Sequence, residues 1–283
     1  MKRLACYMLT VCVLAVAVPL LGCDSAPNEE IARVIFLDVG QGDCTLIRTQ
    51  AGDVLIDAGT EDAEQMLCRR LEDLGVTELA LAVFTHPDED HIGGADGVLK
   101  RIPTEKIWLP QIAQSVENES YRRLLSTAEA TDVEIQYVLA GEGCFLGDVR
   151  LFALAPLRAD ETDSNESSIV LKLVCGAATA ILTGDVGERT ERELIACYGA
   201  EQLSCSLYKA GHHGSSTSSC REFLEALTPT WAIVCCGLDN PYGHPHGEVL
   251  DRMEDQGIVV YRTDLLGEIA FTCDGKRFVP MRD

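Results

Sequence analysis

Residues 79–94 of the chain read LALAVFTHPDEDHIGG. The first seven are apolar apart from the final threonine, and such a continuous run is typical of a strand buried on both faces of a sheet. Residues 86–91, HPDEDH, then bring two histidines and three acidic residues together. The two glycines that follow allow the backbone to turn tightly into a helix. The sequence therefore predicts a group of polar side chains at the carboxyl end of a buried strand.

This residue set favours a metal site. Carboxylates packed so closely repel one another unless a cation lies among them. Neutral imidazole together with carboxylate is a ligand set that suits Zn²⁺ or Mn²⁺. The alternative is a solvated acidic turn that happens to hold two histidines, which the position directly after a buried strand disfavours. We therefore expect metal ligands among His86, Asp88, Asp90 and His91.

The six histidines of the chain all lie where an apolar run ends or a loop begins. Loops after strand ends are where α/β proteins place functional groups. His212 and His213 follow a short strand-like run, and adjacent side chains in extended backbone point to opposite sides. We therefore expect only one of these two to bind metal. His244 lies in a loop rich in proline and glycine, where an active-site role and a plain loop role both remain open.

Strand and helix patterns alternate along the chain, which predicts one mixed α/β domain with helices outside central sheets. Strands are expected at residues 34–39, 44–48, 54–56, 79–85, 106–109, 134–139, 149–154, 168–174, 178–182, 206–209, 231–235, 259–262 and 268–272. Helices are expected at residues 63–74, 94–100, 119–130, 188–197, 219–227 and 248–256.

The N-terminus has the pattern of a secretion signal. A short basic segment precedes an apolar stretch over residues 4–21, and Gly22 then precedes Cys23, as in bacterial lipoproteins, where this cysteine carries lipid. An uncleaved anchor helix is the alternative, but the stretch is at the short end of the roughly 17–25 residues that a span needs. We expect export and anchoring to the membrane through Cys23. The expected organisation is a signal over residues 1–23, a tether over 24–32 and a folded domain over 33–283.

The charge balance is strongly acidic, with 23 Lys and Arg against 45 Asp and Glu and a formal net charge of -22. An acidic surface repels phosphate backbones, so we expect no tight nonspecific binding of nucleic acid. None of the 13 cysteines shows CxxC spacing, which argues against a cysteine zinc site. An exported protein is able to form disulfides, but their pairing does not follow from the sequence.

The HPDEDH segment resembles the His-x-His-x-Asp-His signature of the metallo-β-lactamase superfamily, with Asp88 in place of the second histidine. The variant is similar to the hydrolase domain of the ComEC-like competence proteins. Further matches to that subfamily are LDVGQGD at residues 37–43, IDAG at 56–59, LTGD at 182–185 and HHGS at 212–215. This resemblance implies an α/β fold of the αββα four-layer sandwich type and a metal-dependent hydrolase.

The resemblance also implies roles for individual residues. Asp185 would be a metal ligand, although the residues around it, taken alone, favour a helix cap. His213 would be the metal ligand of its pair and His212 a substrate contact. Two divalent ions, Zn²⁺ or Mn²⁺, are expected, one held by His86, Asp88 and Asp185, the other by Asp90, His91, Asp185 and His213.

Other expected site residues surround these ligands. Asp57 would brace the metal loop from behind, while Asp38 and Asp43 are expected to cap turns. The segment beginning at Asn165 lacks a histidine found in classical members, so the site is rich in oxygen and suits Mn²⁺. The expected catalytic residues are Asp90, His212 and His244. The expected substrate-binding residues are Asn165, Ser168, His212, Ser215 and His244.

The function expected from these features is hydrolysis of phosphodiesters. The chain would act as a phosphodiesterase or nuclease on the extracytoplasmic face of the cell membrane. Two alternatives remain open. One is hydrolysis of another ester class, such as a phosphorylcholine ester, a lactone or a β-lactam, because the fold serves many substrates. The other is a non-catalytic surface lipoprotein that keeps the fold. No obligate protein partner is evident from the sequence.

Overall fold

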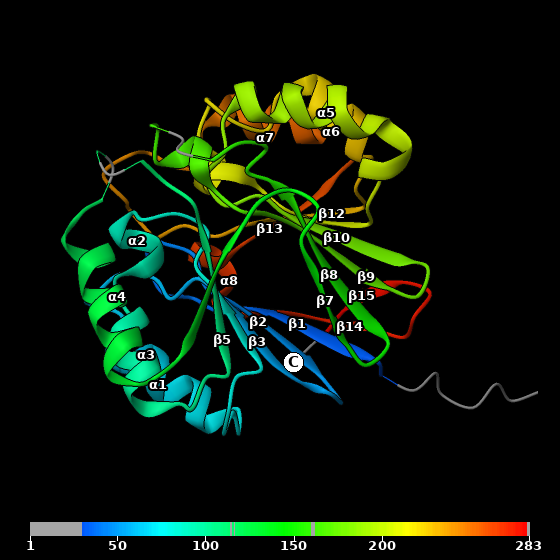
Figure 1. Cartoon of the computed structure of the whole chain (residues 1–283). Coiled ribbons are helices and arrows are strands. Elements are labelled where there is room, and N and C mark those ends of the chain that lie inside the picture. Colours follow the sequence, from blue (N-terminus) through cyan, green and yellow to red (C-terminus); the bar gives the residue numbers. More distant parts are fainter. Residues whose placement is uncertain (1–29, 114, 116, 160–161, 282–283) are drawn as a thin grey trace, which may run out of the picture.

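Two sheets lie face to face, and helices cover the outer side of each (Figure 1). The computed structural model describes residues 30–113, 115, 117–159 and 162–281. The four layers confirm the predicted αββα sandwich. The expected signal and Cys23 lie outside the described residues. None of the described helices is both long enough and apolar enough to span a membrane.

The first sheet has eight strands in the order β15-β14-β1-β2-β3-β4-β5-β6. From β3 to β6 neighbouring strands run parallel, so their carboxyl ends lie along one edge. The strands are β1 Ala32–Phe36, β2 Thr45–Thr49, β3 Gly52–Ile56, β4 Leu81–Val83, β5 Lys106–Pro110, β6 Glu134–Val138, β14 Ile269–Cys273 and β15 Phe278–Pro280.

The second sheet has seven strands in the order β13-β12-β11-β10-β9-β8-β7. Here β10 to β13 run parallel, and the remaining pairs are antiparallel. The strands are β7 Gly143–Leu146, β8 Val149–Ala155, β9 Val170–Cys175, β10 Ala178–Leu182, β11 Leu207–Lys209, β12 Trp231–Val234 and β13 Val259–Arg262.

The outer layers follow from apolar stripes at helical spacing. In α1, for example, Leu67, Cys68 and Leu71 are buried, and apart from Met66 the remaining residues are polar. Helices α1, α3 and α4 cover the first sheet, and α5, α6 and α7 cover the second (Figure 1). The helices are α1 Glu64–Asp73, α2 Glu89–Ile92, α3 Ala95–Arg101, α4 Glu119–Ala130, α5 Glu188–Leu203, α6 Arg221–Leu227, α7 Gly247–Asp255 and α8 Thr263–Leu266.

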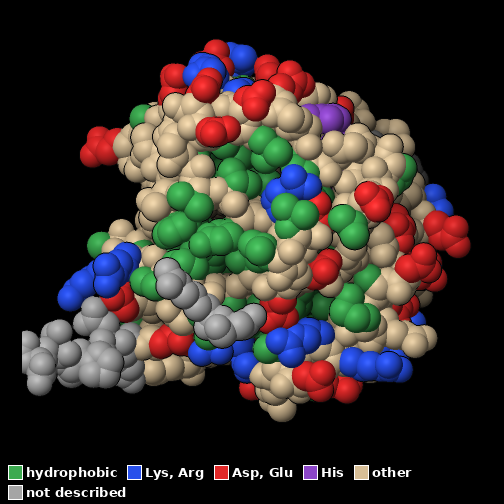
Figure 2. Space-filling view, turned by 180° about the vertical axis from the view of Figure 1, so that it is seen from behind, with side chains coloured by type: hydrophobic (Ala, Val, Ile, Leu, Met, Phe, Trp, Pro, Cys, Tyr) green, Lys and Arg blue, Asp and Glu red, His purple; other side chains and the backbone are tan. Residues whose placement is uncertain are grey.

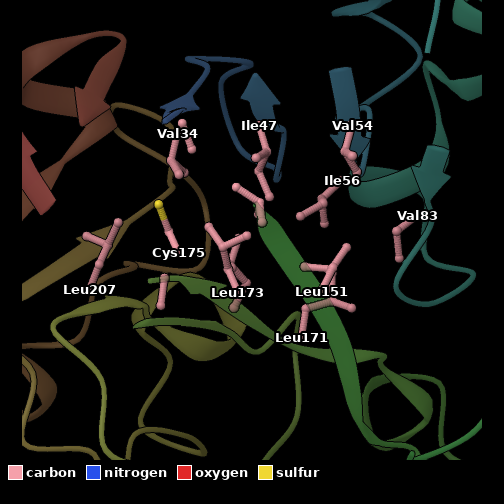
Figure 3. Packing of buried hydrophobic residues seen from close by; sticks show 14 of the residues in the cluster. Val34, Ile47, Val54, Ile56, Val83, Leu151, Leu171, Leu173, Cys175 and Leu207 are labelled. Carbon is pink, nitrogen blue, oxygen red and sulfur yellow. The ribbon is translucent and has the colours of Figure 1, made fainter. Parts of the chain in front are cut away.

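Apolar side chains from both sheets interdigitate to form the central core (Figure 3). In β1, Val34 and Phe36 belong to this central cluster, whereas Ile35 between them packs in the cluster under α1 and α3. The alternation follows from the two-residue period of a strand, and because both faces are covered, both sets are apolar. Leu171 and Leu173 of β9 meet the first set from the opposite sheet.

Several elements differ from the expected ones. The strand expected at residues 79–85 is shorter, because only Leu81–Val83 pair along their length and Leu79 forms an isolated bridge. Helix α5 runs beyond the expected end, with a break at Gly199, whose φ is 66°. Strands β7 and β15 and the short helices α2 and α8 were not expected from the sequence. Short elements such as these owe their form to tertiary contacts rather than to a periodic pattern.

Candidate metal centre

Loops from both sheets meet at one end of the sandwich. Asp57 follows β3 and the HPDEDH segment follows β4, both in the first sheet. Asp185 follows β10 and His213 follows β11, both in the second sheet. Parallel strands bring their carboxyl ends to the same edge, which explains why residues so distant in sequence lie together. The contacts below show that the two edges form one site.

Four buried side chains converge at this junction. Asp43, His91, Asp185 and His213 each offer a ligand atom, and these atoms all lie within 4.8 Å of one another. His91 Nε2 is 3.1 Å from Asp185 Oδ1, and His213 Nε2 is 3.4 Å from Asp185 Oδ2. Asp90 approaches from α2, with Oδ2 3.1 Å from His213 Nε2. The arrangement provides nitrogen and oxygen donors around one point.

The two histidines of the cluster are oriented by hydrogen bonds at their other ring nitrogen. Asp57 Oδ2 lies 2.8 Å from His91 Nδ1, and the same carboxylate accepts the Thr85 N–H at 2.7 Å. His213 Nδ1 lies 2.9 Å from the carbonyl oxygen of Cys235. These bonds direct Nε2 of each ring toward Asp185, as in the supporting contacts of metal-ligating histidines, whereas Asp43 lies on the other side, with Oδ1 3.4 Å from His213 Nδ1.

His86 and Asp88 lie beside this cluster. His86 Nε2 is 3.7 Å from Asp88 Oδ2, and its ring centre is 4.1 Å from that of His91. Burial, together with the nearby His91, lowers the pKa of His86 to about 3, so its imidazole is neutral and able to bind a cation. Asp88 is more exposed and accepts a hydrogen bond from Ser164 Oγ at 3.2 Å.

The structure adds two residues to the expected site, Asp43 and Lys209. Asp43 does not cap its turn, whereas Asp38 does, accepting the Gly40 N–H at 3.1 Å. Instead the Asp43 carboxylate contacts the buried Lys209 ammonium, which also donates to the Gly184 carbonyl at 3.3 Å. Sequence reasoning treated Lys209 as the end of a strand. A lone lysine in an apolar run is the signal in the sequence that could have indicated this pair. Lysine is almost never fully buried unless it is paired, so a lysine in a buried strand implies an acidic partner.

The choice between His212 and His213 rests on backbone geometry that differs from the expected one. Both residues have positive φ, 48° and 53°, so the backbone is left-handed here rather than extended. His213 is buried in the cluster, and His212 lies nearer the surface, its Nε2 3.8 Å from Asp185 Oδ2. The two side chains still diverge, but because of a tight turn rather than strand alternation.

The charge balance of the cluster favours a cation. Although burial opposes the charged imidazolium, Asp185 and Asp43 raise the pKa of His213 to about 10. Despite its own burial, Asp185 has a pKa well below the usual range because His91 and His213 lie beside it. The protons on the imidazoles thus offset the negative charge of the carboxylates. A divalent ion at the same place would offset this charge in their stead.

The donor atoms themselves fit a metal ion. Several buried atoms here have no hydrogen-bond partner among the described residues, although buried polar atoms are generally paired. A mixed set of imidazole and carboxylate donors accommodates Zn²⁺ or Mn²⁺. The unpartnered atoms are Asp43 Oδ1, His86 Nε2, His91 Nε2 and Asp185 Oδ1.

A small cavity of about 190 Å³ opens beside the cluster. Of the expected substrate-binding residues, Ser168 and Ser215 do not line it. Ser168 Oγ accepts the Asp185 N–H at 3.0 Å and so supports the cluster from behind, while Ser215 Oγ lies 3.0 Å from Thr217 Oγ1. The lining residues are Gln41, Asp88, Asp90, Asn165, Asp185, His212, His213, Tyr242 and His244.

The segment that carries His213 is anchored at its far end by a buried glutamate. Glu191 of α5 accepts the backbone N–H groups of Ser219 and Cys220, the latter at 2.8 Å. The Ser219 hydroxyl lies 2.9 Å from the Tyr208 hydroxyl, which accepts the Gly211 N–H. Burial raises the pKa of Glu191 from 4.5 to about 7. Glu191 therefore anchors the end of the loop that leaves the cluster, together with Arg252, which donates to the carbonyl oxygens of Ser218 and Ser219.

Residues 37–237 match the family model of the metallo-beta-lactamase superfamily. The chain belongs to this superfamily. It is 32% identical to ComE operon protein 3 of Bacillus subtilis over 84% of this chain and 33% of the relative. It is 34% identical to competence protein ComA of Neisseria gonorrhoeae, over 88% and 33%. These matches confirm the resemblance to ComEC-like proteins, and the chain spans about a third of the length of these relatives.

Solved structures show the same fold. A diphosphatase of the PhnP family aligns with a TM-score of 0.53 at 18% identity, covering 86% of this chain and 99% of that one. A metal-dependent hydrolase of the β-lactamase superfamily aligns with a TM-score of 0.53 at 15% identity, covering 82% and 95%. The superfamily consists mostly of hydrolases, and this chain combines its fold with a candidate metal site.

Replacing Asp57 with alanine should weaken metal binding without removing a ligand of the cluster. His91 would lose the acceptor that orients its ring, and such losses typically cost roughly 10–100-fold in metal affinity. Calorimetric titration of the metal-free chain with Mn²⁺ and Zn²⁺ measures the effect. Asp38→Ala is the matched control, because Asp38 caps a turn by bonding Gly40. Equal affinity in Asp57→Ala and Asp38→Ala would contradict the bracing role.

Glu191 should make stability depend on pH in a defined direction. Its pKa in the folded chain, about 7, lies above the ordinary glutamate value of 4.5, so the folded state holds the proton more tightly. The stabilisation is full below pH 4.5 and is lost as the pH rises to 7, by roughly 3 kcal/mol. Glu191→Gln, which cannot ionise, lacks this loss.

Urea unfolding between pH 4.5 and 8 measures the difference in unfolding free energy between the wild type and Glu191→Gln. The free energy of unfolding of the wild type should fall relative to that of Glu191→Gln as the pH rises. Glu225→Gln serves as the control, because Glu225 is an exposed residue of α6. A difference that stays constant with pH would rule out the raised pKa.

Proposed function

We propose that the chain is a metal-dependent phosphodiesterase or nuclease. The observation that carries the proposal is the convergence of Asp43, His91, Asp185 and His213 beside a polar cavity. Relatives named for competence and recombination support a nucleic-acid phosphodiester as the substrate. The oxygen-rich donor set supports a hard or borderline cation such as Mn²⁺ or Zn²⁺.

His91, Asp185 and His213, with Asp90, would hold one divalent ion at the Nε2 atoms, and Asp43 would support His213 from its Nδ1 side. His86 and Asp88 lie close enough to the cluster to complete a second position. An ion held there supplies Lewis-acid chemistry, because it lowers the pKa of water and offsets negative charge on a phosphoryl oxygen. The chain itself contributes the fixed geometry, through the hydrogen bonds that Asp57 and the Cys235 carbonyl make to the two rings.

Two further histidines would handle protons and the substrate. His212 is partly exposed at the cavity, with Nδ1 3.3 Å from Thr217 Oγ1, and is placed to deliver a proton to the departing oxygen. His244 is buried, and burial with the neighbouring His213 lowers its pKa to about 4. Its neutral ring, with Nδ1 unpartnered among the described residues, would hydrogen-bond the substrate.

Export and membrane anchoring are part of the proposal. The basic segment, the apolar stretch over residues 4–21 and the Gly22-Cys23 pair support a lipid on Cys23. The membrane is then the partner of the anchored chain, and the domain acts on the outer side. A lipid-anchored hydrolase at this position would meet phosphodiesters from outside the cell.

Substitution of Cys23 should abolish lipid attachment. The full chain, expressed in a bacterial host that is fed an alkyne-labelled fatty acid, should take up label and sediment with membranes. Cys23→Ala should remain unlabelled, because the thiol that carries the lipid is gone. Cys197→Ala, which removes an exposed cysteine of the folded domain, should keep the label. Equal labelling of the two variants would refute the anchor.

Asp90→Ala should abolish metal-dependent hydrolysis of phosphodiesters. We expect a loss of more than about 100-fold, since even residues that only support a ligand cost roughly 10–100-fold. Bis(p-nitrophenyl) phosphate and a single-stranded oligonucleotide are the substrates, with Mn²⁺ or Zn²⁺ and with a chelator. Asp251→Ala, at an exposed position of α7, is the control and should retain full activity.

Two outcomes would overturn the proposal. One is full activity in Asp90→Ala. The other is a wild type that binds metal but cleaves only a lactone, a phosphorylcholine ester or a β-lactam, which would assign the site to another ester class. A wild type inactive on the whole panel would favour a binding role for the fold.

A further inference from the structure

The loop that follows β12 presents an aromatic residue in a fixed position. Asn240 Nδ2 donates to the carbonyl oxygens of Gly237 at 2.9 Å and His244 at 2.6 Å. Asn240 Oδ1 accepts the His244 N–H at 3.0 Å. These three bonds close the loop on itself, and Tyr242 lies between the bonded residues. A side chain on such a loop is held in place before a ligand arrives, which lowers the entropic cost of binding.

The rings of this loop form a stack that leads into the metal centre. The Tyr242 ring lies 5.6 Å from that of His244 at an interplanar angle of 22°. His244 in turn stacks on His213, at 6.1 Å and 27°. Tyr242 is 63% exposed, so the face of its ring that does not contact His244 is open to a planar ligand.

The same cavity offers polar groups beside the stack. His244 is 9% exposed, and its Nδ1 has no hydrogen-bond partner among the described residues. Gln41 accepts the Gly237 N–H through Oε1 at 3.1 Å, which leaves its Nε2 as an unpartnered donor. Both residues line the cavity together with Tyr242. Both of these unpartnered atoms are buried in residues of the cavity wall, and a wall that combines polar groups with an aromatic face suits a flat heterocycle that carries polar edges.

Charge does not supply affinity for a polyanion here. The described residues that line the cavity include no Lys or Arg, and the formal net charge of the chain is -22. On the face shown in Figure 2, Lys and Arg lie among Asp and Glu rather than in one continuous tract. Ordinary nucleic-acid binding relies on such cations to neutralise phosphates. Besides a metal ion at the cluster, stacking on an aromatic ring is a contact that could hold a nucleic-acid strand without cationic side chains.

We propose that Tyr242 stacks on a nucleobase next to the scissile phosphodiester, which makes single-stranded nucleic acid the preferred substrate. The proposal rests on the phosphodiesterase function above and narrows its substrate class. A duplex keeps its bases stacked on one another, so only an unpaired base is available to the ring. A phosphodiester without a base would lack the contact and bind more weakly.

The test compares two labelled oligonucleotides of equal length, one of thymidylates and one with abasic tetrahydrofuran units. The full chain with Mn²⁺ should show a KM roughly 10-fold or more lower for the base-containing strand. Tyr242→Ala should raise that KM by a similar factor with kcat little changed, and Tyr242→Phe should restore it. Leu238→Ala, an exposed apolar residue of the same loop outside the cavity lining, should leave both constants unchanged.

Equal KM values for the two strands, or an unchanged KM in Tyr242→Ala, would overturn the stacking role while leaving the phosphodiesterase function intact. If the wild type cleaves neither strand, the proposed function fails, and fluorescence anisotropy with the same two oligonucleotides decides the inference. Equal binding of both strands then overturns it, and tighter binding of the thymidylate strand that Tyr242→Ala abolishes supports it. Metal titration of Tyr242→Ala checks that the centre is intact.

Discussion

Repulsion among buried carboxylates governs the architecture of the metal centre. Asp43 and Asp185 are buried and Asp90 beside them is half-buried, and such charges persist only beside positive charge. In the absence of a metal ion, the Lys209 ammonium and protonated imidazoles provide that charge. A divalent ion would replace the imidazole protons and bring more charge to the same point. The cluster is therefore poised for a cation, with Lys209 reducing the repulsion in the metal-free chain.

The two sheets share the task of building this centre. Asp43 and His91 come from the half of the chain that forms the first sheet, and Asp185 and His213 come from the half that forms the second. Their separation thus depends on how the sheets pack. The buried apolar side chains between the sheets fix that packing at the density of a protein interior (Figure 3). Hydrogen bonds accepted by Asp57, Ser168 and Glu191 then hold the individual loops to the strands and helices behind them.

The cavity beside the centre explains how an acidic protein could act on an anionic substrate. No cationic side chain lines it among the described residues, so contact with a phosphate falls to the metal ion and to neutral donors such as His244. The stacked rings of Tyr242 and His244 offer contact area that carries no charge. Contact through a metal ion, neutral donors and stacked rings suits brief binding of single strands. Tight binding along duplex DNA depends on many phosphate contacts, which this cavity does not offer.

Local sequence patterns by themselves determined the alternation of strands and helices, and the HPDEDH segment after a buried strand indicated a candidate metal site. Such features are visible because periodicity and the succession of residue types act over a few positions. Tertiary structure alone decided that Asp43 joins the cluster, that Lys209 pairs with it, and that Ser168 supports Asp185 rather than facing the cavity. The Asp43–Lys209 contact joins the two sheets, and the Ser168–Asp185 bond joins loops at neighbouring strands of the second sheet. Their distances follow from the packing of the whole core, which no local pattern encodes.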